Sequence, residues 1–169
     1  MRQIKHAYKT RSQGGSSFIE VAISSVALGI IVLFGMDAYV WTQAFMINDL
    51  ACRDAARAAA QARPPSGANT IAAYSAAAQQ AADRELKVMH INTAGPYIKN
   101  PQLVSCVWNG VGPGDPLPAP PATPTVTVQT SIDMMLPFPL FFMSQQVAPG
   151  GKLVFRRSYT FPLVVLPST

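Results

Sequence analysis

An uninterrupted apolar segment near the N-terminus constrains this chain more than any other feature of its sequence. Residues 21–36 read VAISSVALGIIVLFGM and contain no charged side chain. As a helix they would cover roughly 24 Å, and counting from Phe18 through Trp41 makes the segment long enough for the ~30 Å hydrocarbon core of a bilayer. Tyr39 and Trp41 would then lie at the far interface, where aromatic rings accumulate. The sequence therefore predicts a membrane-spanning helix, residues 16–41.

The charge of the chain is concentrated before this segment. Of the 169 residues, 49% are hydrophobic and only 12% are charged, about half of the charged share of an average soluble domain. Four of the 13 basic residues precede Gly14, and the remaining nine are nearly balanced by eight acidic residues. A basic arm directly before an apolar run is typical of the cytoplasmic flank of a membrane helix. Because the rest of the chain is almost neutral, the sequence indicates a basic leader peptide, residues 1–15, and no nucleic-acid partner.

The helix is predicted to continue beyond the apolar segment. Residues 42–63, TQAFMINDLACRDAARAAAQAR, contain no Gly or Pro and are rich in Ala, the best helix former. Asp49 and Arg53 are four residues apart with the acid first, a spacing that favours an ion pair on one helix face. Two prolines follow directly and end the helix at about Arg63. We therefore expect a soluble helical stem, residues 42–63, that continues the membrane helix.

Residues 64–169 are predicted to form an α+β head. A second short helix follows the sequence SGAN, with Asn69 or Thr70 as its N-cap. Three later segments alternate apolar and polar residues as half-buried strands do: 103–108, 125–133 and 152–161. We expect a small antiparallel sheet on which the long N-terminal helix packs. The fold class predicted for the whole chain is therefore α+β.

One apolar segment of the head fits neither a regular helix nor a central strand. Residues 134–143 read MMLPFPLFFM, and their two prolines interrupt both kinds of backbone hydrogen bonding. The segment either folds over the sheet as part of the core or forms an exposed contact with the membrane or a partner protein. The sequence leaves both interpretations open.

Two cysteines, Cys52 on the stem and Cys106 in the first strand, follow the membrane segment. If the head is translocated, they lie in an oxidising compartment and can form a disulfide bond. Such a bond would close a long loop and stabilise the head by roughly 3–4 kcal/mol on the chain-entropy estimate. The alternative is two unpaired buried thiols, and the pairing is a hypothesis.

The sequence predicts no enzyme, no metal site and no cofactor. Its two histidines, His6 and His90, are far apart, and the carboxylates show no paired spacing on one element. Motifs for a serine hydrolase, a zinc protease or a phosphate-binding loop are absent from the sequence. Asp37 is the first charged residue after the apolar run. It indicates either the boundary between lipid and water or, less simply, an intramembrane site for a partner.

The segment GGSSFIE, residues 14–20, resembles the processing site of type IV prepilins. In that family a membrane peptidase cuts after a glycine, and a glutamate is the fifth residue of the mature chain. Cleavage after Gly15 makes Ser16 the first residue and Glu20 the fifth, whereas cleavage after Gly14 would make Glu20 the sixth. The resemblance therefore implies cleavage between Gly15 and Ser16. It also implies that Glu20 pairs with the N-terminal amine of a neighbouring subunit and so sets the assembly register.

Further residues are similar to the TadE-like pseudopilins, minor pilin-like proteins of the tight-adherence (Flp-type) pilus system. They are the Ala/Arg stretch 52–62 and the Val/Thr strand followed by LPFPLFF. The head is far larger than that of the short Flp pilins, which implies a minor or assembly role. The resemblance implies a single-pass protein of the bacterial inner membrane, with the N-terminus in the cytoplasm, a periplasmic head and possible incorporation in a surface-attachment pilus. The implied partners are the prepilin peptidase, other pilins or pseudopilins, the pilus assembly machine and the cytoplasmic membrane.

Two other functions are compatible with the same architecture. A pseudopilin of type II secretion is a near relative, although such proteins more often have Phe or Met after the cut and calcium-binding loops in the head. A signal-anchored periplasmic enzyme or binding domain would need a pocket with convergent polar residues, and the sequence shows no such cluster. We expect the structural, pilin-like function.

Overall fold

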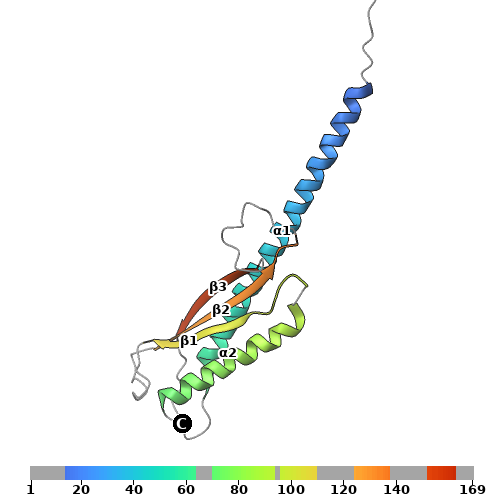
Figure 1. Ribbon diagram of the computed structural model, residues 1–169. Coiled ribbons are helices and arrows are strands. Elements are labelled where there is room, and N and C mark those ends of the chain that lie inside the picture. Colours follow the sequence, from blue (N-terminus) through green and yellow to red (C-terminus); the bar gives the residue numbers. More distant parts are fainter. Residues whose placement is uncertain (1–13, 64–69, 94–95, 110–123, 138–151, 163–169) are drawn as a thin grey trace, which may run out of the picture. The chain divides into compact units, whose positions relative to one another are not determined.

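The computed structural model describes residues 14–63, 70–93, 96–109, 124–137 and 152–162. The chain folds into two helices and three strands, in the order α1 (Gly14–Gln61), α2 (Ile71–Thr93), β1 (Gln102–Asn109), β2 (Thr125–Met135) and β3 (Lys152–Pro162) (Figure 1). It divides into two compact units, Met1–Met36 and Asp37–Thr169. The predicted α+β class, with a long N-terminal helix, a second helix and a small antiparallel sheet, is confirmed.

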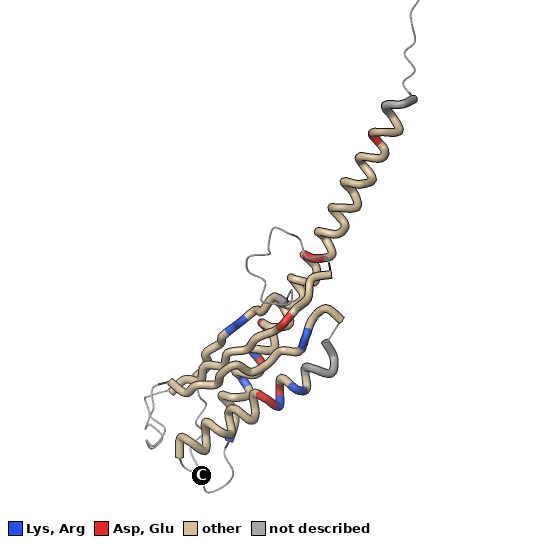
Figure 2. The backbone as a smooth tube through the Cα atoms, in the orientation of Figure 1, with Lys and Arg blue, Asp and Glu red and all other residues tan. Residues whose placement is uncertain are grey.

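The described part of the first unit is the N-terminal portion of α1. Between Glu20 and Asp37 this helix carries no charged residue (Figure 2). Its large apolar side chains are exposed all around the helix: Phe18, Ile19, Val21, Ile23, Val26, Leu28, Ile30, Ile31, Val32, Leu33, Phe34 and Met36. No described residue before Asp37 is buried. This portion of α1 therefore contributes nothing to a protein core of its own.

The second unit is built on a three-stranded antiparallel sheet in the order β1-β2-β3. The central strand β2 pairs with both neighbours, Val128 lying opposite Cys106 of β1 and Tyr159 of β3. The β1–β2 register shifts between Leu103 and Ser105. The alternation predicted from the sequence continues through the whole of β2, whose residues are buried and half-buried in turn.

One face of this sheet is covered by both helices. The buried row of β2 comprises Val126, Val128, Thr130, Ile132 and Met134. Small residues of the helices pack on this row: Ala51, Ala55, Ala56 and Ala59 of α1, and Ala78 and Ala82 of α2. Methyl side chains let a helix backbone approach a sheet closely, so this core is filled mainly by β-branched strand residues and alanines.

Aromatic rings complete the core at two places. Trp108 of β1 lies 5.9 Å from the ring of Tyr74 on α2, measured between centroids, and joins α2 to the first strand. Trp41 of α1 lies 6.2 Å from the ring of Phe155 on β3. A smaller apolar cluster of Ala44, Ile132 and Met134 surrounds the second contact.

Several predicted details can be compared directly with the structure. Helix α1 ends at Gln61, two residues before the predicted end. Thr70 is the N-cap of α2, because its Oγ1 accepts a hydrogen bond from the backbone N–H of Ala73 at 3.4 Å. The expected ion pair between Asp49 and Arg53 is not the one formed, since Asp49 instead contacts Arg157 of β3.

The apolar segment 134–143 is only partly covered by the described residues. Met134 continues β2 and is buried in the core, and Met135 is half exposed on the other face. Leu136 and Pro137 are half-buried. Residues 138–143 lie outside the described ranges.

Candidate functional site

The predicted cleavage site lies at the beginning of α1. The helix begins at Gly14, so the backbone of Gly15 and Ser16 belongs to its first turn. Residues 1–13 of the predicted leader 1–15 lie outside the described ranges, as do the surroundings of the first three helical residues. The assignment of Gly15 and Ser16 to a cleavage site stays a prediction from the sequence.

Glu20 is the only charged residue of α1 before Asp37. Its side chain is exposed, and it forms no ion pair with any residue that the structure describes. The neighbouring side chains of Ile19 and Val21 are large, apolar and exposed. A carboxylate in such an apolar stretch is unfavourable in lipid by several kcal/mol unless it is paired or remains near the interface. Before Asp37, Glu20 is therefore the position of this helix where a cationic partner would have a large effect.

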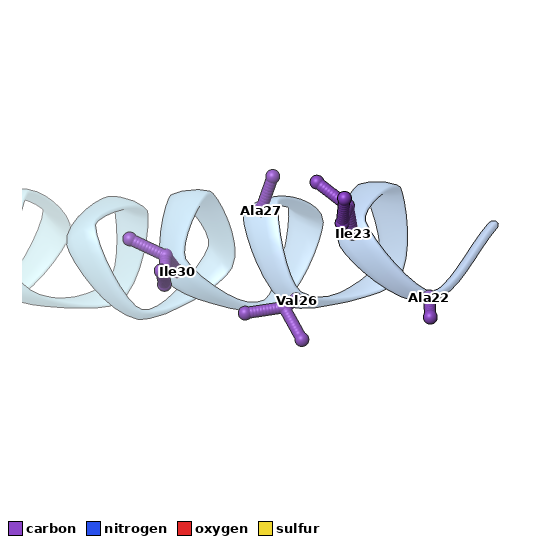
Figure 3. Close-up of a pocket in the computed structure, with 5 residues that line it drawn as sticks. All are labelled: Ala22, Ile23, Val26, Ala27 and Ile30. Atoms are coloured by element: carbon purple, nitrogen blue, oxygen red, sulfur yellow. The ribbon is translucent and has the colours of Figure 1, made fainter. Parts of the chain in front are cut away.

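The surface that follows Glu20 is uncharged and mostly apolar. A shallow open groove runs along one side of the helix between Ala22, Ile23, Val26, Ala27 and Ile30, whose side chains contain only carbon (Figure 3). Nearby, the Ser25 hydroxyl donates a hydrogen bond of 2.8 Å to the carbonyl of Ala22 in the same helix. Because this hydroxyl is satisfied locally, it does not need water or a partner.

Helix α1 is long and apolar enough to span a membrane. The most apolar window between Ser17 and Gln61 has a mean hydropathy of 2.3, and none of it is buried inside the protein. A helix of this hydropathy in the core of a globular protein would be mostly covered. The described part of the chain thus contains a helix suited to a single-pass membrane anchor.

The residues predicted to mark the far interface differ in their surroundings. Tyr39 is exposed, whereas Trp41 is half covered by its contact with Phe155. Asp37 is only 5% exposed. The first charge after the apolar run is therefore enclosed in the second unit rather than displayed on its surface.

A buried polar contact fixes α1 on the sheet. The hydroxyl of Thr130 on β2 donates a hydrogen bond of 2.8 Å to Oδ1 of Asn48, and Nδ2 of Asn48 donates one of 3.1 Å to the carbonyl of Phe155 on β3. Asn48 and Thr130 are both fully buried. Polar groups buried in an apolar core are unfavourable unless paired, so this contact favours a single register of the helix on the strands. This contact is not predicted from the sequence, where its only signal is an Asn within an Ala-rich helix.

A second cluster, also missed from the sequence, joins α1 to β3 near the surface. The carboxylate of Asp49 accepts hydrogen bonds from the Tyr159 hydroxyl at 3.1 and 3.2 Å and lies 3.6 Å from Nε of Arg157. The Arg157 guanidinium also lies over the Phe45 ring, 4.1 Å from its centroid. The hydrogen bond to the Asp49 carboxylate raises the pKa of Tyr159. Arg157 thus receives both a carboxylate and an aromatic partner from α1.

Both cysteines are free thiols, so the predicted disulfide bond is not present in the structure. Cys52 is fully buried, and its Sγ lies 3.4 Å from the carbonyl oxygens of both Val128 and Arg157, so its single S–H can donate to either. It therefore lies over β2 and β3, while Cys106 is on β1, on the other side of β2. Burial raises the pKa of both thiols. Both side chains pack in or against the core, and the Cys52 thiol also contacts the two strand carbonyls.

No group of three His, Cys, Asp or Glu side chains converges within the described ranges. Comparison with protein-family models, with curated proteins and with solved structures finds no match to this chain. The functional interpretation therefore depends on the residues and the geometry of this protein.

Proposed function

We propose that this protein is a minor pilin-like (pseudopilin) component of a tight-adherence type pilus. It is cleaved after Gly15, held in the inner membrane by α1 with its head in the periplasm, and used in assembly of a surface-attachment fibre. The observation that carries the proposal is the spacing of Gly15 and Glu20 immediately before an uncharged stretch of 16 residues, 21–36. A plain signal anchor needs neither the glycine nor the glutamate.

The chemistry of Glu20 supports this function. Cleavage after Gly15 creates an α-amino group on Ser16, a cation that the intact chain does not have at this place. Two opposite charges in a medium of low dielectric attract each other far more strongly than in water. Pairing Glu20 of one subunit with the amine of the next would neutralise both charges and define how far the two helices are displaced along their axes.

The second unit supports an assembly role rather than catalysis. Its core is small and continuous with the C-terminal half of α1, through the Asn48–Thr130 contact and the Asp49 cluster. These contacts join the C-terminal half of α1 firmly to the sheet of the head. A subunit that is drawn out of a membrane by its neighbours needs such a connection.

Two adjacent glycines allow a matched test of the cleavage site. The full chain is expressed with a prepilin peptidase of the tight-adherence system, and its N-terminus is determined by mass spectrometry. Gly15→Ala should leave the leader attached, because the residue before the cut must be glycine, whereas Gly14→Ala should be cleaved normally. Normal cleavage of Gly15→Ala, or loss of cleavage only in Gly14→Ala, would contradict the assignment.

The register role of Glu20 has a separate readout. Glu20→Ala and the isosteric Glu20→Gln should both be inserted and cleaved, because neither adds charge to the apolar segment. Both should fail to enter assembled fibres, because neither can pair with an amine as an ion. Fibre incorporation equal to that of the unaltered chain in both variants would remove this role from Glu20.

A further inference from the structure

Three segments of the second unit meet where β2 ends, at one end of the sheet that is called the edge below. They are the end of β2, the beginning of β3 and the segment before β1. Met135, the last residue of β2, pairs with Lys152, the first residue of β3. The backbone N–H of Met135 also donates a hydrogen bond of 2.8 Å to the carbonyl of Tyr97, and Ile98 forms a β-bridge with Met134. The segment before β1 is thereby fixed beside the end of β2.

A groove at this edge lies between α1 and the segment before β1. It is open, and it is lined on one side by Tyr39, Val40, Gln43 and Ile47 and on the other by Pro96, Tyr97 and Ile98. Tyr39 and Tyr97 are far apart in the sequence, yet both line this groove, and they are 66% and 42% exposed. The half-exposed thioether of Met135 belongs to the same edge.

The distribution of exposed aromatic side chains over the second unit is uneven. Among its described residues, the large exposed aromatic side chains are Tyr39, Trp41, Phe45 and Tyr97. Tyr39, Trp41 and Phe45 lie near the beginning of the unit, and Tyr97 lies in the segment that lines the groove opposite α1. At the opposite end of β2, the outer face of the sheet carries hydrogen-bonded polar side chains instead. There, Thr127 Oγ1 lies 2.8 Å from Thr160 Oγ1 and 2.7 Å from Nδ2 of Asn109.

We propose that the edge formed by Tyr39, Tyr97 and Met135 is a lipid-docking surface that contacts the headgroup region of the bilayer spanned by α1. Tyr39 follows Met36, the last residue of the uncharged run, after only three residues, which is a helix rise of about 4.5 Å. That depth corresponds to the interfacial layer, where Tyr and Trp rings place an apolar body and a polar tip.

Two further features suit a lipid surface. Lys99 is exposed two residues after Tyr97, and an ammonium on a long apolar stem suits lipid phosphates. The sequence also continues from Met135 into LPFPLFFM, so the chain is strongly apolar where it leaves this edge. The docking surface rests on the membrane span of α1 and depends neither on cleavage nor on pilus assembly.

Tryptophan quenching by spin-labelled lipid tests the docking surface in the full-length protein. The chain is reconstituted in phosphatidylcholine vesicles that contain a nitroxide on the lipid headgroup. In a Trp41→Phe background the remaining Trp108 is buried and gives the baseline. Tyr97→Trp is then added at the edge, Met135→Trp serves as a second probe there, and Thr160→Trp is the matched control at the opposite end.

The expected result is strong quenching of the signal added by Tyr97→Trp and Met135→Trp, at least half of that seen for Trp41 in the unaltered chain. The signal added by Thr160→Trp should not respond to the labelled lipid. If Trp41 is quenched but neither edge probe is quenched, the docking surface is contradicted and the membrane span of α1 is not. If Trp41 is not quenched either, the lipid–water interface does not lie near Tyr39 and Trp41, and the docking surface is contradicted as well.

Discussion

The two halves of α1 differ in how much of their apolar surface the fold buries, and the more hydrophobic half is the exposed one. Residues 17–36 contain most of the large apolar side chains of the helix, and all of those in this half are exposed. Residues 37–61 are richer in alanine and charged residues, and this half supplies the core. The most hydrophobic part of the chain is therefore the part that its own fold does not bury.

Side-chain size and the pattern of charges explain the difference. In the second half, small residues recur on one face and Arg53 and Arg57 occupy another, so one side can lie close to the sheet while the other faces water. In the first half the apolar side chains surround the helix, which leaves no polar side for water. A helix of the second kind suits a protein core, and a helix of the first kind suits lipid or other helices.

The largest expected effect comes from placing a charge in the first half. Leu28→Arg puts a guanidinium near the middle of the uncharged run, which disfavours membrane insertion by about 2.5–3.5 kcal/mol. The membrane-bound fraction after alkaline extraction should fall sharply. Val88→Arg, at an exposed position of α2, is the matched control and should remain bound. Equal extraction of the two variants would mean that the first half does not cross the bilayer.

The next largest effect comes from adding volume to the second half. Ala56 is fully buried in the core, and Ala56→Leu should lower the stability of the second unit by about 3 kcal/mol through overpacking. Its thermal transition, followed by circular dichroism in detergent, should fall by about 10 °C. Ala27→Leu makes the same change at an exposed position of the first half and should leave this transition in place. A comparable shift in both variants would contradict the division of the helix.

A smaller effect is expected at the polar contact between α1 and the sheet. Thr130→Val removes the hydroxyl and leaves the buried Oδ1 of Asn48 without its donor, which should lower stability by about 1–2 kcal/mol. Thr160→Val, on the outer face, is the control and should change stability less. Combining Thr130→Val with Asn48→Leu gives a double-mutant cycle, and additive losses would show that the two side chains do not interact.

The smallest effect concerns the cysteines. Because burial raises the pKa of Cys52 and Cys106, the folded protein keeps both thiols protonated at pH values where the unfolded chain, with a pKa of about 8.5, begins to lose the proton. Keeping the thiols protonated therefore makes the free energy of unfolding depend on pH. Their contribution to stability is complete below the pKa of the unfolded chain and is lost as the pH rises through the pKa of the folded protein.

Native alkylation of these thiols at pH 8 should therefore be slow, slower at Cys52 than at half-buried Cys106, and both should react rapidly after unfolding. Mass spectrometry of the alkylated protein without reductant measures both sites. Two thiols that stay unreactive until a reductant is added would show that the disulfide bond predicted from the sequence does form.

The architecture could be predicted from the sequence, but its long-range contacts could not. The second half of α1 follows from the Ala-rich run 42–63 without Gly or Pro, and β2 follows from the alternation along 125–133, because both are local patterns. Asn48 and Thr130 are 82 residues apart in the sequence, and nothing local to either indicates the other. The ion pair of Asp49 illustrates the same limit, because the nearby Arg53 suggested a local partner while the fold supplied Arg157.

We propose that the chain acts in assembly only after residues 1–15 have been removed. The most direct test is mass spectrometry of the N-terminal peptide of this protein, taken from assembled, functional fibres or from the complex that builds them. We expect a chain that begins at Ser16, with Glu20 as its fifth residue. Assembled protein that still begins at Met1, or at any residue other than Ser16, would contradict it.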